Sequence, residues 1–188
     1  MLTGDRVRLR ALDASDTDTV WSWYQDHEFS TLDGNIYPSS RASTEAFLRS
    51  LPAPSFADVS LGIETETGEM IGIVRLKRIS PEHRHADFGI AIARPWWDRG
   101  YGTDATRTIL RFAFEEMQLH RVNLTVHDYN ERARRVYQKC GFVEEGRLRE
   151  SKWIRGRWHD RVQMGVLSRE WRQLDAPGNA STPPSTET

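Results

Sequence analysis

Seven stretches of the chain carry the apolar pattern of β-strands and are separated by polar segments or turn residues. Segment 6–12, for example, alternates apolar with basic residues. One pair of stretches flanks the polar turn Glu66–Glu69 and another pair flanks Gly156, so each pair predicts a hairpin. The predicted strands are residues 6–12, 59–65, 70–79, 86–94, 121–126, 142–154 and 158–167.

Four other segments have helical periodicity. Residues 13–26 combine capping residues with an amphipathic pattern, and a proline pair ends a second helix over residues 43–51. Residues 103–117 gather apolar side chains on one side of a third helix, and residues 130–140 form a fourth helix that Gly141 closes. The resulting order, β-α-α-β-β-β-α-β-α-β-β, predicts an α+β fold.

The length and charge of the chain narrow the class of protein. A length of 188 residues fits one domain, which we place at residues 1–172, and residues 173–188 lack the apolar side chains that would order them, so they are predicted to be a disordered tail. The formal net charge of -1 gives no overall field that would recruit nucleic acid or an anionic membrane. The N-terminus has no signal-peptide pattern and no apolar run reaches membrane-spanning length, which predicts a soluble, cytoplasmic protein.

The residues that commonly bind metals are few and scattered. Cys140 is the single cysteine, which excludes an internal disulfide and a cysteine-based zinc site. His83 and His85 lie in a polar turn, while His120 and His127 stand alone. The sequence therefore predicts no metal site.

The stretch WWDRGYGTDA, residues 96–105, predicts an anion site. Its two glycines, Gly100 and Gly102, precede a helix whose first N–H groups and dipole favour an anion. The same letters fit the dinucleotide fingerprint G-x-G-x-x-G/A, with Asp128 near the position of a ribose ligand. However, five residues separate the preceding strand from the first glycine, and too few residues follow for the repeated βαβ units of a dinucleotide fold. We therefore keep the anion site and reject a nicotinamide ligand.

Three segments, residues 86–105, 130–146 and 148–167, together resemble the GNAT superfamily of acyl-CoA-dependent N-acetyltransferases. They resemble in particular the branch that contains ribosomal-protein N-terminal and spermidine N-acetyltransferases, and the resemblance extends over about residues 71–167. It implies a GNAT fold, with a central mixed, mostly antiparallel sheet of about seven strands flanked by four helices, and acetyl-CoA as acyl donor without a metal. One position departs from the family pattern, since Trp97 stands where Gln or Arg is common.

The resemblance implies which residues hold the cofactor. Residues 99–103 would cradle the pyrophosphate of coenzyme A, and the strand at Ile90 and Ile92 would splay from its neighbour and pair with the pantetheine arm. For Asn130 a plain helix N-cap stays open as its sole role, and for Lys139 a solvated surface lysine does. The implied cofactor residues are Ile90, Ile92, Arg99, Gly100, Tyr101, Gly102, Thr103, Asn130 and Lys139.

Two residues match the positions of the family's acid and base. Tyr137 matches the general acid, because a tyrosine is protonated at neutral pH and could protonate a departing thiolate. The alternative for Tyr137 is packing, since it shares a helical face with Val136 and Cys140, and Cys140 itself is predicted to be a core residue. Asp87 occupies the strand position of the base, and the alternative there is a surface or ion-paired aspartate.

The acceptor is predicted to be a primary amine, either a protein or peptide N-terminus or a small amine such as a polyamine. Asp26, Glu28 and Asp33 lie in the segment that forms the acceptor wall in relatives, although an ordinary charged loop is the alternative. Deprotonating an α-amine at pH 7 costs about 3 kcal/mol less than deprotonating a lysine-like amine, which favours the α-amine. A non-catalytic acyl-CoA sensor is the alternative function. Tyr137 favours the enzyme, because a sensor needs no proton donor at the sulfur.

The last predicted hairpin is basic and aromatic, with Trp153 and Trp158 at positions that pair across its strands. A solvated outer face explains this hairpin better than RNA contact does. We therefore expect no nucleic acid and no membrane as partners. A homodimer stays open as an alternative to a monomer.

Overall fold

Eight strands in one sheet and six α-helices make up the part of the chain that the computed structural model describes, residues 1–35 and 37–175. The strands are β1 (Leu2–Thr3), β2 (Val7–Ala11), β3 (Val59–Thr65), β4 (Met70–Ser80), β5 (His85–Ile92), β6 (Arg121–His127), β7 (Val143–Ile154) and β8 (Arg157–Leu167). The helices are α1 (Thr17–Trp23), α2 (His27–Asp33), α3 (Arg41–Ser50), α4 (Tyr101–Arg111), α5 (Glu131–Lys139) and α6 (Ser168–Asp175). A π-helical turn, Phe112–Glu116, continues α4.

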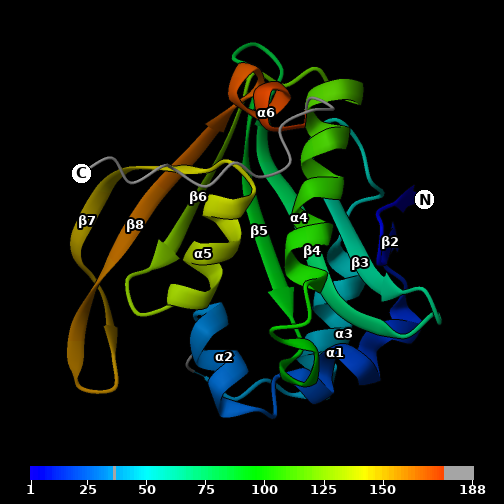
Figure 1. Cartoon of the computed structure of the whole chain (residues 1–188). Helices are drawn as coiled ribbons and strands as arrows, with labels where there is room; N and C mark the ends of the chain where they lie inside the picture. The colour runs from blue at the N-terminus through cyan, green and yellow to red at the C-terminus, as the bar shows by residue number, and fades with distance from the viewer. Residues whose placement is uncertain (36, 176–188) are drawn as a thin grey trace.

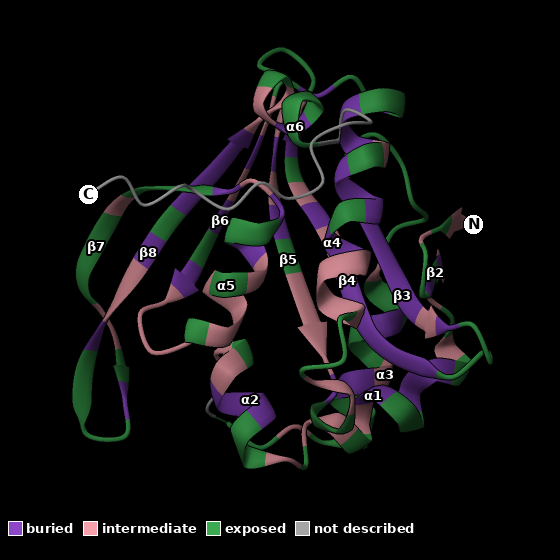
Figure 2. Cartoon of the chain, in the orientation of Figure 1, coloured by how far each residue is buried: buried purple, intermediate pink, exposed green. Residues whose placement is uncertain are grey.

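The helices cover both faces of the sheet (Figure 1). Helices α4 and α5 lie on one face, where α4 buries Ala105 and Ile109 in the main core. Helices α1 and α3 lie on the opposite face, where Val20 and Leu48 pack with Ile73 of β4 in a second, smaller cluster. Figure 2 shows the buried residues running along the central strands, while most of β7 at the edge of the sheet is exposed.

The strand order is β1-β2-β3-β4-β5-β6-β8-β7, and β5 with β6 is its one parallel pair among the described residues. Pairing of β5 with β6 begins at His85 and Arg121 and ends at Asp87 and Asn123. Beyond that point the two strands diverge, while β5 stays paired with β4 as far as Ile92. The sheet is therefore split, and α5 and α2 lie at the opening (Figure 1).

Both predicted hairpins are present. At the first, Gly68 has a φ of 83°, and the backbone N–H of Thr65 donates to the carbonyl of Glu69. At the second, Arg155 and Gly156 both have positive φ, as a two-residue turn of type I′ requires. Trp153 pairs with Trp158 next to this turn, with the ring centroids 5.2 Å apart.

The α+β fold predicted from the sequence is confirmed, with corrections to its elements. The described residues hold eight strands rather than about seven, and six α-helices rather than four. The elements that the sequence pattern missed are β1, α2 and α6. Helix α6 extends three residues into the predicted tail because Trp171 is buried against Phe114, with ring centroids 5.6 Å apart. The rest of that predicted tail, residues 176–188, lies outside the described residues.

Candidate active site

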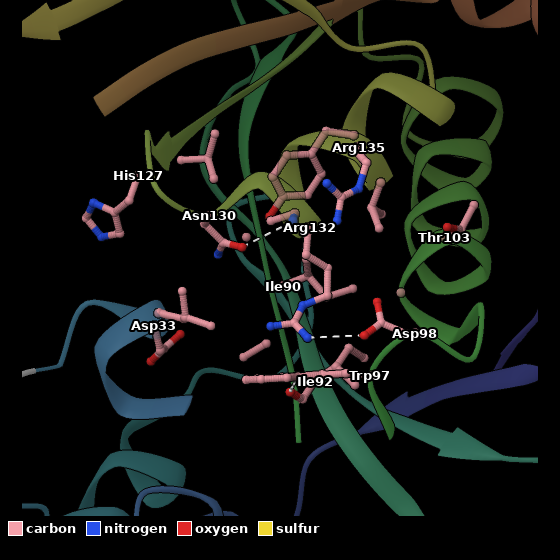
Figure 3. Close-up of a pocket in the computed structure, with 18 of the residues that line it drawn as sticks. Asp33, Ile90, Ile92, Trp97, Asp98, Thr103, His127, Asn130, Arg132 and Arg135 are labelled. Carbon is pink, nitrogen blue, oxygen red and sulfur yellow. Dashed lines mark hydrogen bonds and ion pairs between the residues drawn. The ribbon is translucent and has the colours of Figure 1, made fainter. Parts of the chain in front are cut away.

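A cavity of about 450 Å³ occupies the split in the sheet. Residues 88–92 of β5 form one wall and residues 125–127 of β6 form the facing wall. Helix α2, the start of α4 and one side of α5 enclose the remaining sides, as Figure 3 shows. Because β5 has no strand partner along 88–92 on this side, its backbone N–H and C=O groups border the cavity.

The glycine turn stands at the start of α4, as predicted. Gly100 is the N-cap residue of α4 and has a φ of 86°, a conformation that side chains other than glycine rarely adopt. At Gly102 an added Cβ would find no protein atom closer than Ile92 Cγ1 at 4.0 Å, so the backbone is open toward the cavity. Asp104 fixes the helix start by accepting hydrogen bonds from the backbone N–H groups of residues 5–7. The first-turn N–H groups of α4 therefore meet the cavity at a fixed place.

Most of the predicted cofactor residues line this cavity. Asn130 both lines it and caps α5, since its Oδ1 accepts a hydrogen bond of 3.2 Å from the N–H of Ala133. Arg99 and Tyr101 are not among the lining residues, but both contact Trp96, which lines the cavity. The predicted residues that do line the cavity are Ile90, Ile92, Gly100, Gly102, Thr103, Asn130 and Lys139.

Tyr137 lines the same cavity although only 8% of its surface is exposed. A Schellman motif ends its helix, since the N–H of Gly141 donates to the carbonyl of Gln138 and the N–H of Phe142 donates to that of Tyr137. The rings of Phe88 and Phe142 lie 5.9 Å from the Tyr137 ring. Burial raises the pKa of Tyr137, and the nearby Asp33 charge adds to this effect. The hydroxyl is therefore a protonated group at neutral pH.

The predicted base, Asp87, lies on β5 one residue before the stretch that lines the cavity. Its carboxylate accepts a hydrogen bond from Nε of Arg78 and forms an ion pair with that guanidinium. Asp87 is therefore an ion-paired residue outside the cavity lining, which is the alternative that its sequence position left open.

The three predicted acceptor-wall acids fall into two groups. Asp33 lines the cavity, and the hydroxyl of Tyr24 donates a hydrogen bond of 2.8 Å to it. Asp33 is an exposed residue, yet the protein atoms around its carboxylate raise its pKa by desolvation. Asp26 and Glu28 lie at the other end of α2, outside the lining, and each is 3.2 Å from the guanidinium of Arg94. Of the three acids, Asp33 is therefore the one that lines the cavity.

Several lining residues were not predicted. The Arg132 guanidinium lies 3.6 Å from the centre of the Trp97 ring and 3.4 Å from the Asp98 carboxylate (Figure 3). The indole N–H of Trp97 donates a hydrogen bond of 2.6 Å to the carbonyl of Ile92, so tryptophan at this position anchors the loop to the end of β5. Arg135 is another α5 cation at the cavity. The spacing of residues 132, 135 and 139 places all three cations on one side of the helix, and this spacing could have predicted them from the sequence.

His127 is a further unpredicted lining residue. Its ring stacks on Tyr129 with centroids 5.1 Å apart, and its Nδ1 atom is buried without a hydrogen-bond partner among the described residues. Burial lowers the pKa of His127, so the ring is neutral at neutral pH.

Cys140 lies in the apolar core next to the cavity. This residue is 3% exposed in the core, as predicted, and desolvation raises the pKa of its thiol to about 12. It is therefore a packing residue rather than a nucleophile.

In the described part of the chain, no cluster of three or more His, Cys, Asp or Glu side chains could hold a metal ion. No helix there is long and apolar enough to cross a membrane.

The residues present fit coenzyme A. The open backbone edge of β5 matches the amide groups of a pantetheine arm, and an added Cβ at Gly89 would meet no protein atom within 4 Å. The helix start at Gly102 and the α5 cations Arg132 and Lys139 match the charge of a pyrophosphate.

A split sheet with a glycine-initiated helix at its opening places the protein in the class of acetyltransferase folds. The family described as Acetyltransferase (GNAT) domain matches residues 6–143, and the chain belongs to this family. Among curated relatives, the Vibrio cholerae spermidine N(1)-acetyltransferase is 35% identical over 109 residues, 58% of this chain and 63% of that protein. YdaF of Bacillus subtilis (strain 168), a candidate ribosomal N-acetyltransferase by name, is 35% identical over 119 residues, 62% of this chain and 64% of that protein.

These alignments span slightly less than two thirds of the length of each relative. A solved structure gives broader coverage. The crystal structure of the Vibrio cholerae spermidine N-acetyltransferase in complex with CoA and spermine has a TM-score of 0.79 at 28% identity. It covers 88% of this chain and 97% of that chain. The resemblance that the sequence motifs indicated is thereby confirmed.

Proposed function

We propose that the protein is an N-acetyltransferase that moves an acetyl group from acetyl-CoA directly to a primary amine. The observation that carries this proposal is the meeting of three features at one cavity. These are the open edge of β5, the start of α4 and the buried hydroxyl of Tyr137. Relatives named as N-acetyltransferases support the enzyme over a non-catalytic sensor.

The chain would hold the donor along three elements, α4, α5 and β5. The N–H groups at Gly102 and Thr103, with the α5 cations, would bind the pyrophosphate, while backbone groups near Ile90 would pair with the pantetheine amides. The chemistry supplied by bound acetyl-CoA is an acetyl group activated as a thioester. Arg99 and Tyr101 would support the loop through their contacts with Trp96.

Tyr137 is proposed as the proton donor to the departing thiolate. Its raised pKa keeps the phenol protonated at working pH, and its packing holds the hydroxyl at the cavity wall. A positioned general acid of this kind typically contributes about 10² to 10⁴ to the rate.

Two carboxylates compete for the role of proton acceptor from the amine. Asp33 lines the cavity and has no ion-pair partner among the described residues, whereas Asp87 is bound by Arg78 outside the lining. Asp33 is therefore the better supported candidate. Its raised pKa also makes it a stronger base than an ordinary aspartate.

The test is acetyl-CoA-dependent release of free thiol with a panel of amines. The panel holds spermidine, an aminoglycoside and short peptides with free N-termini, and each product is identified by mass. We expect at least one primary amine to be acetylated at a rate well above hydrolysis of the donor. Tight binding of acetyl-CoA with no transfer to any amine would support a sensor instead.

A further inference from the structure

The N-terminal end of α2 carries two carboxylates that Arg94 already occupies. Asp26 caps the helix, because its Oδ1 accepts hydrogen bonds from the backbone N–H groups of Glu28 and Phe29. Its other oxygen, Oδ2, lies 3.2 Å from the guanidinium of Arg94. The second branch of the same guanidinium lies 3.2 Å from Glu28 Oε2. Arg94 lies just after the end of β5. Its single guanidinium therefore forms ion pairs with both Asp26 and Glu28.

Asp33 lies on the same helix but in a different setting. It stands seven positions after Asp26, which places the two about 10 Å apart along the helix axis. This distance suits the separated charges of a polyamine, provided that the carboxylates at both ends are free. Asp26 and Glu28 do not meet this condition because Arg94 binds both, whereas Asp33 has no ion-pair partner among the described residues. The other cavity-lining carboxylate in that part of the chain, Asp98, is paired with Arg132.

Apolar side chains line the cavity on one side of Asp33, while the hydroxyl of Tyr24 and the charges of Lys77 and Arg75 act on its carboxylate. Phe29, one helical turn before Asp33, and Leu32 line this part of the cavity, and Phe88 of β5 lines it as well. Phe29 is buried and held by the rings of Trp23 and Tyr24. A ligand docked at Asp33 therefore meets one carboxylate with apolar side chains on one side of it.

We infer that the acceptor is an amine with a single positive charge and an apolar group beside it, and that Arg94 disfavours polyamines by occupying Asp26 and Glu28. This inference rests on the proposed acetyltransferase function. The ammonium docks at Asp33 and the apolar group packs on Phe29 and Leu32. Such an amine can be a small arylalkylamine or a peptide N-terminus with a hydrophobic first residue.

The test compares acceptors in the wild type and in Arg94→Gln. The kcat/KM values for 2-phenylethylamine, a leucine-initiated peptide amide and spermidine are measured at low salt by thiol release. Binding of each amine to the CoA-bound protein is measured by calorimetry as a readout independent of turnover. Comparing the rates for 2-phenylethylamine and for the peptide amide shows whether a small molecule or a peptide N-terminus is the better acceptor.

We expect the wild type to prefer a monoamine, and R94Q to raise the ratio of spermidine to monoamine by about two- to fivefold, the effect of one surface ion pair. The gain should vanish in high salt and should be smaller in the double variant R94Q/E28Q, in which Asp26 is the one acid of the pair that remains. The matched control is Arg49→Gln, which removes an exposed, ion-paired arginine on α3 and should leave the ratio unchanged.

An unchanged ratio in R94Q would overturn the inference, as would a wild-type preference for spermidine. Failure of every amine to be acetylated would instead count against the proposed function.

Discussion

Packing, rather than hydrogen bonding, holds the hydroxyl of Tyr137 in position. Its ring lies between Phe88 of β5 and Phe142 just beyond α5, and the turn at Gly141 fixes Phe142 relative to the helix. Among the described residues the hydroxyl has no hydrogen-bond partner, so its proton is available to a group in the cavity. The side chain thus serves both the core and the site.

Replacing Tyr137 with Phe separates these two roles. The ring contacts stay, so we expect the melting temperature to change little. The rate of transfer should fall by about 10² to 10⁴, the range for loss of a general acid, while acetyl-CoA affinity is kept. Steady-state kinetics and calorimetry check both parts. A variant that melts much lower and keeps full turnover per folded molecule would show that Tyr137 only packs.

Asp33→Asn should lower activity and raise stability together. Desolvation lifts the Asp33 pKa in the folded state above its ordinary value of 3.8, so the folded protein binds this proton more tightly than the unfolded chain does. Stability therefore falls as pH rises through the interval between the two pKa values, and the ionised carboxylate is unfavourable at pH 7. D33N should melt higher than wild type at pH 7, and the difference should disappear at a pH below 3.8.

The same variant should reduce kcat/KM for amines by about 10² or more, as loss of a general base does. Asp87→Asn is the comparison, and we expect it to change kcat/KM by no more than about fivefold, the effect of a surface ion pair. The reverse order of effects would return the role of base to Asp87.

At this scale the sequence predicts residues whose roles depend on their own neighbours in the chain. Gly100 and Gly102 are identified by the turn they make, and Asn130 by its place before a helix. The pairing of Asp87 with Arg78 and the stacking of Arg132 on Trp97 depend on segments brought together by folding. A pattern read along one segment cannot show such contacts.

Among the elements, α4 begins where the strands β5 and β6 have separated. This arrangement places the helix N-terminus, rather than a side chain, at the opening of the split. Anion binding there depends on close approach of a ligand to the backbone, which the absence of a Cβ at Gly102 permits.

Gly102→Val should therefore block the ligand without unfolding the protein. The nearest protein atom to an added Cβ is 4.0 Å away, so the branched side chain would project into the cavity instead of the core. We expect acetyl-CoA affinity to fall by about tenfold or more, comparable with loss of one charge-assisted hydrogen bond. Calorimetry on the folded variant checks this, and unchanged affinity would remove the glycine turn from the site. Gly72→Val is the contrast, because a Cβ there would lie 2.4 Å from the carbonyl oxygen of Ala91.

The strands were easier to predict than the short helices. The β3 range matches its prediction because its apolar run ends at a polar turn. Helix α2 was missed because its seven residues are too few to show periodicity, although Asp26 at its start and Gly34 in the left-handed region at its end mark its limits. Short helices depend on caps and tertiary packing more than on pattern.

For the whole molecule, the net charge of -1 leaves ligand attraction to local groups. The α5 cations and the α4 start are gathered at one cavity, so an acyl-CoA should bind there without general attraction to polyanions. We expect acetyl-CoA to raise the melting temperature by mass action, whereas NADH should leave it unchanged. A thermal-shift titration with both ligands checks this. Stabilisation by NADH alone would restore the dinucleotide interpretation of the glycines.

The split between β5 and β6 has a cost for the protein without its ligand. Two strand edges face each other across the gap without pairing with each other, and unpaired edges act as templates for pairing with other chains. Helices α2 and α5 restrict access to the gap, and a ligand bonded to β5 would complete its edge. The supply of acyl-CoA should therefore govern how long the protein resists aggregation during storage, even at temperatures far below its unfolding.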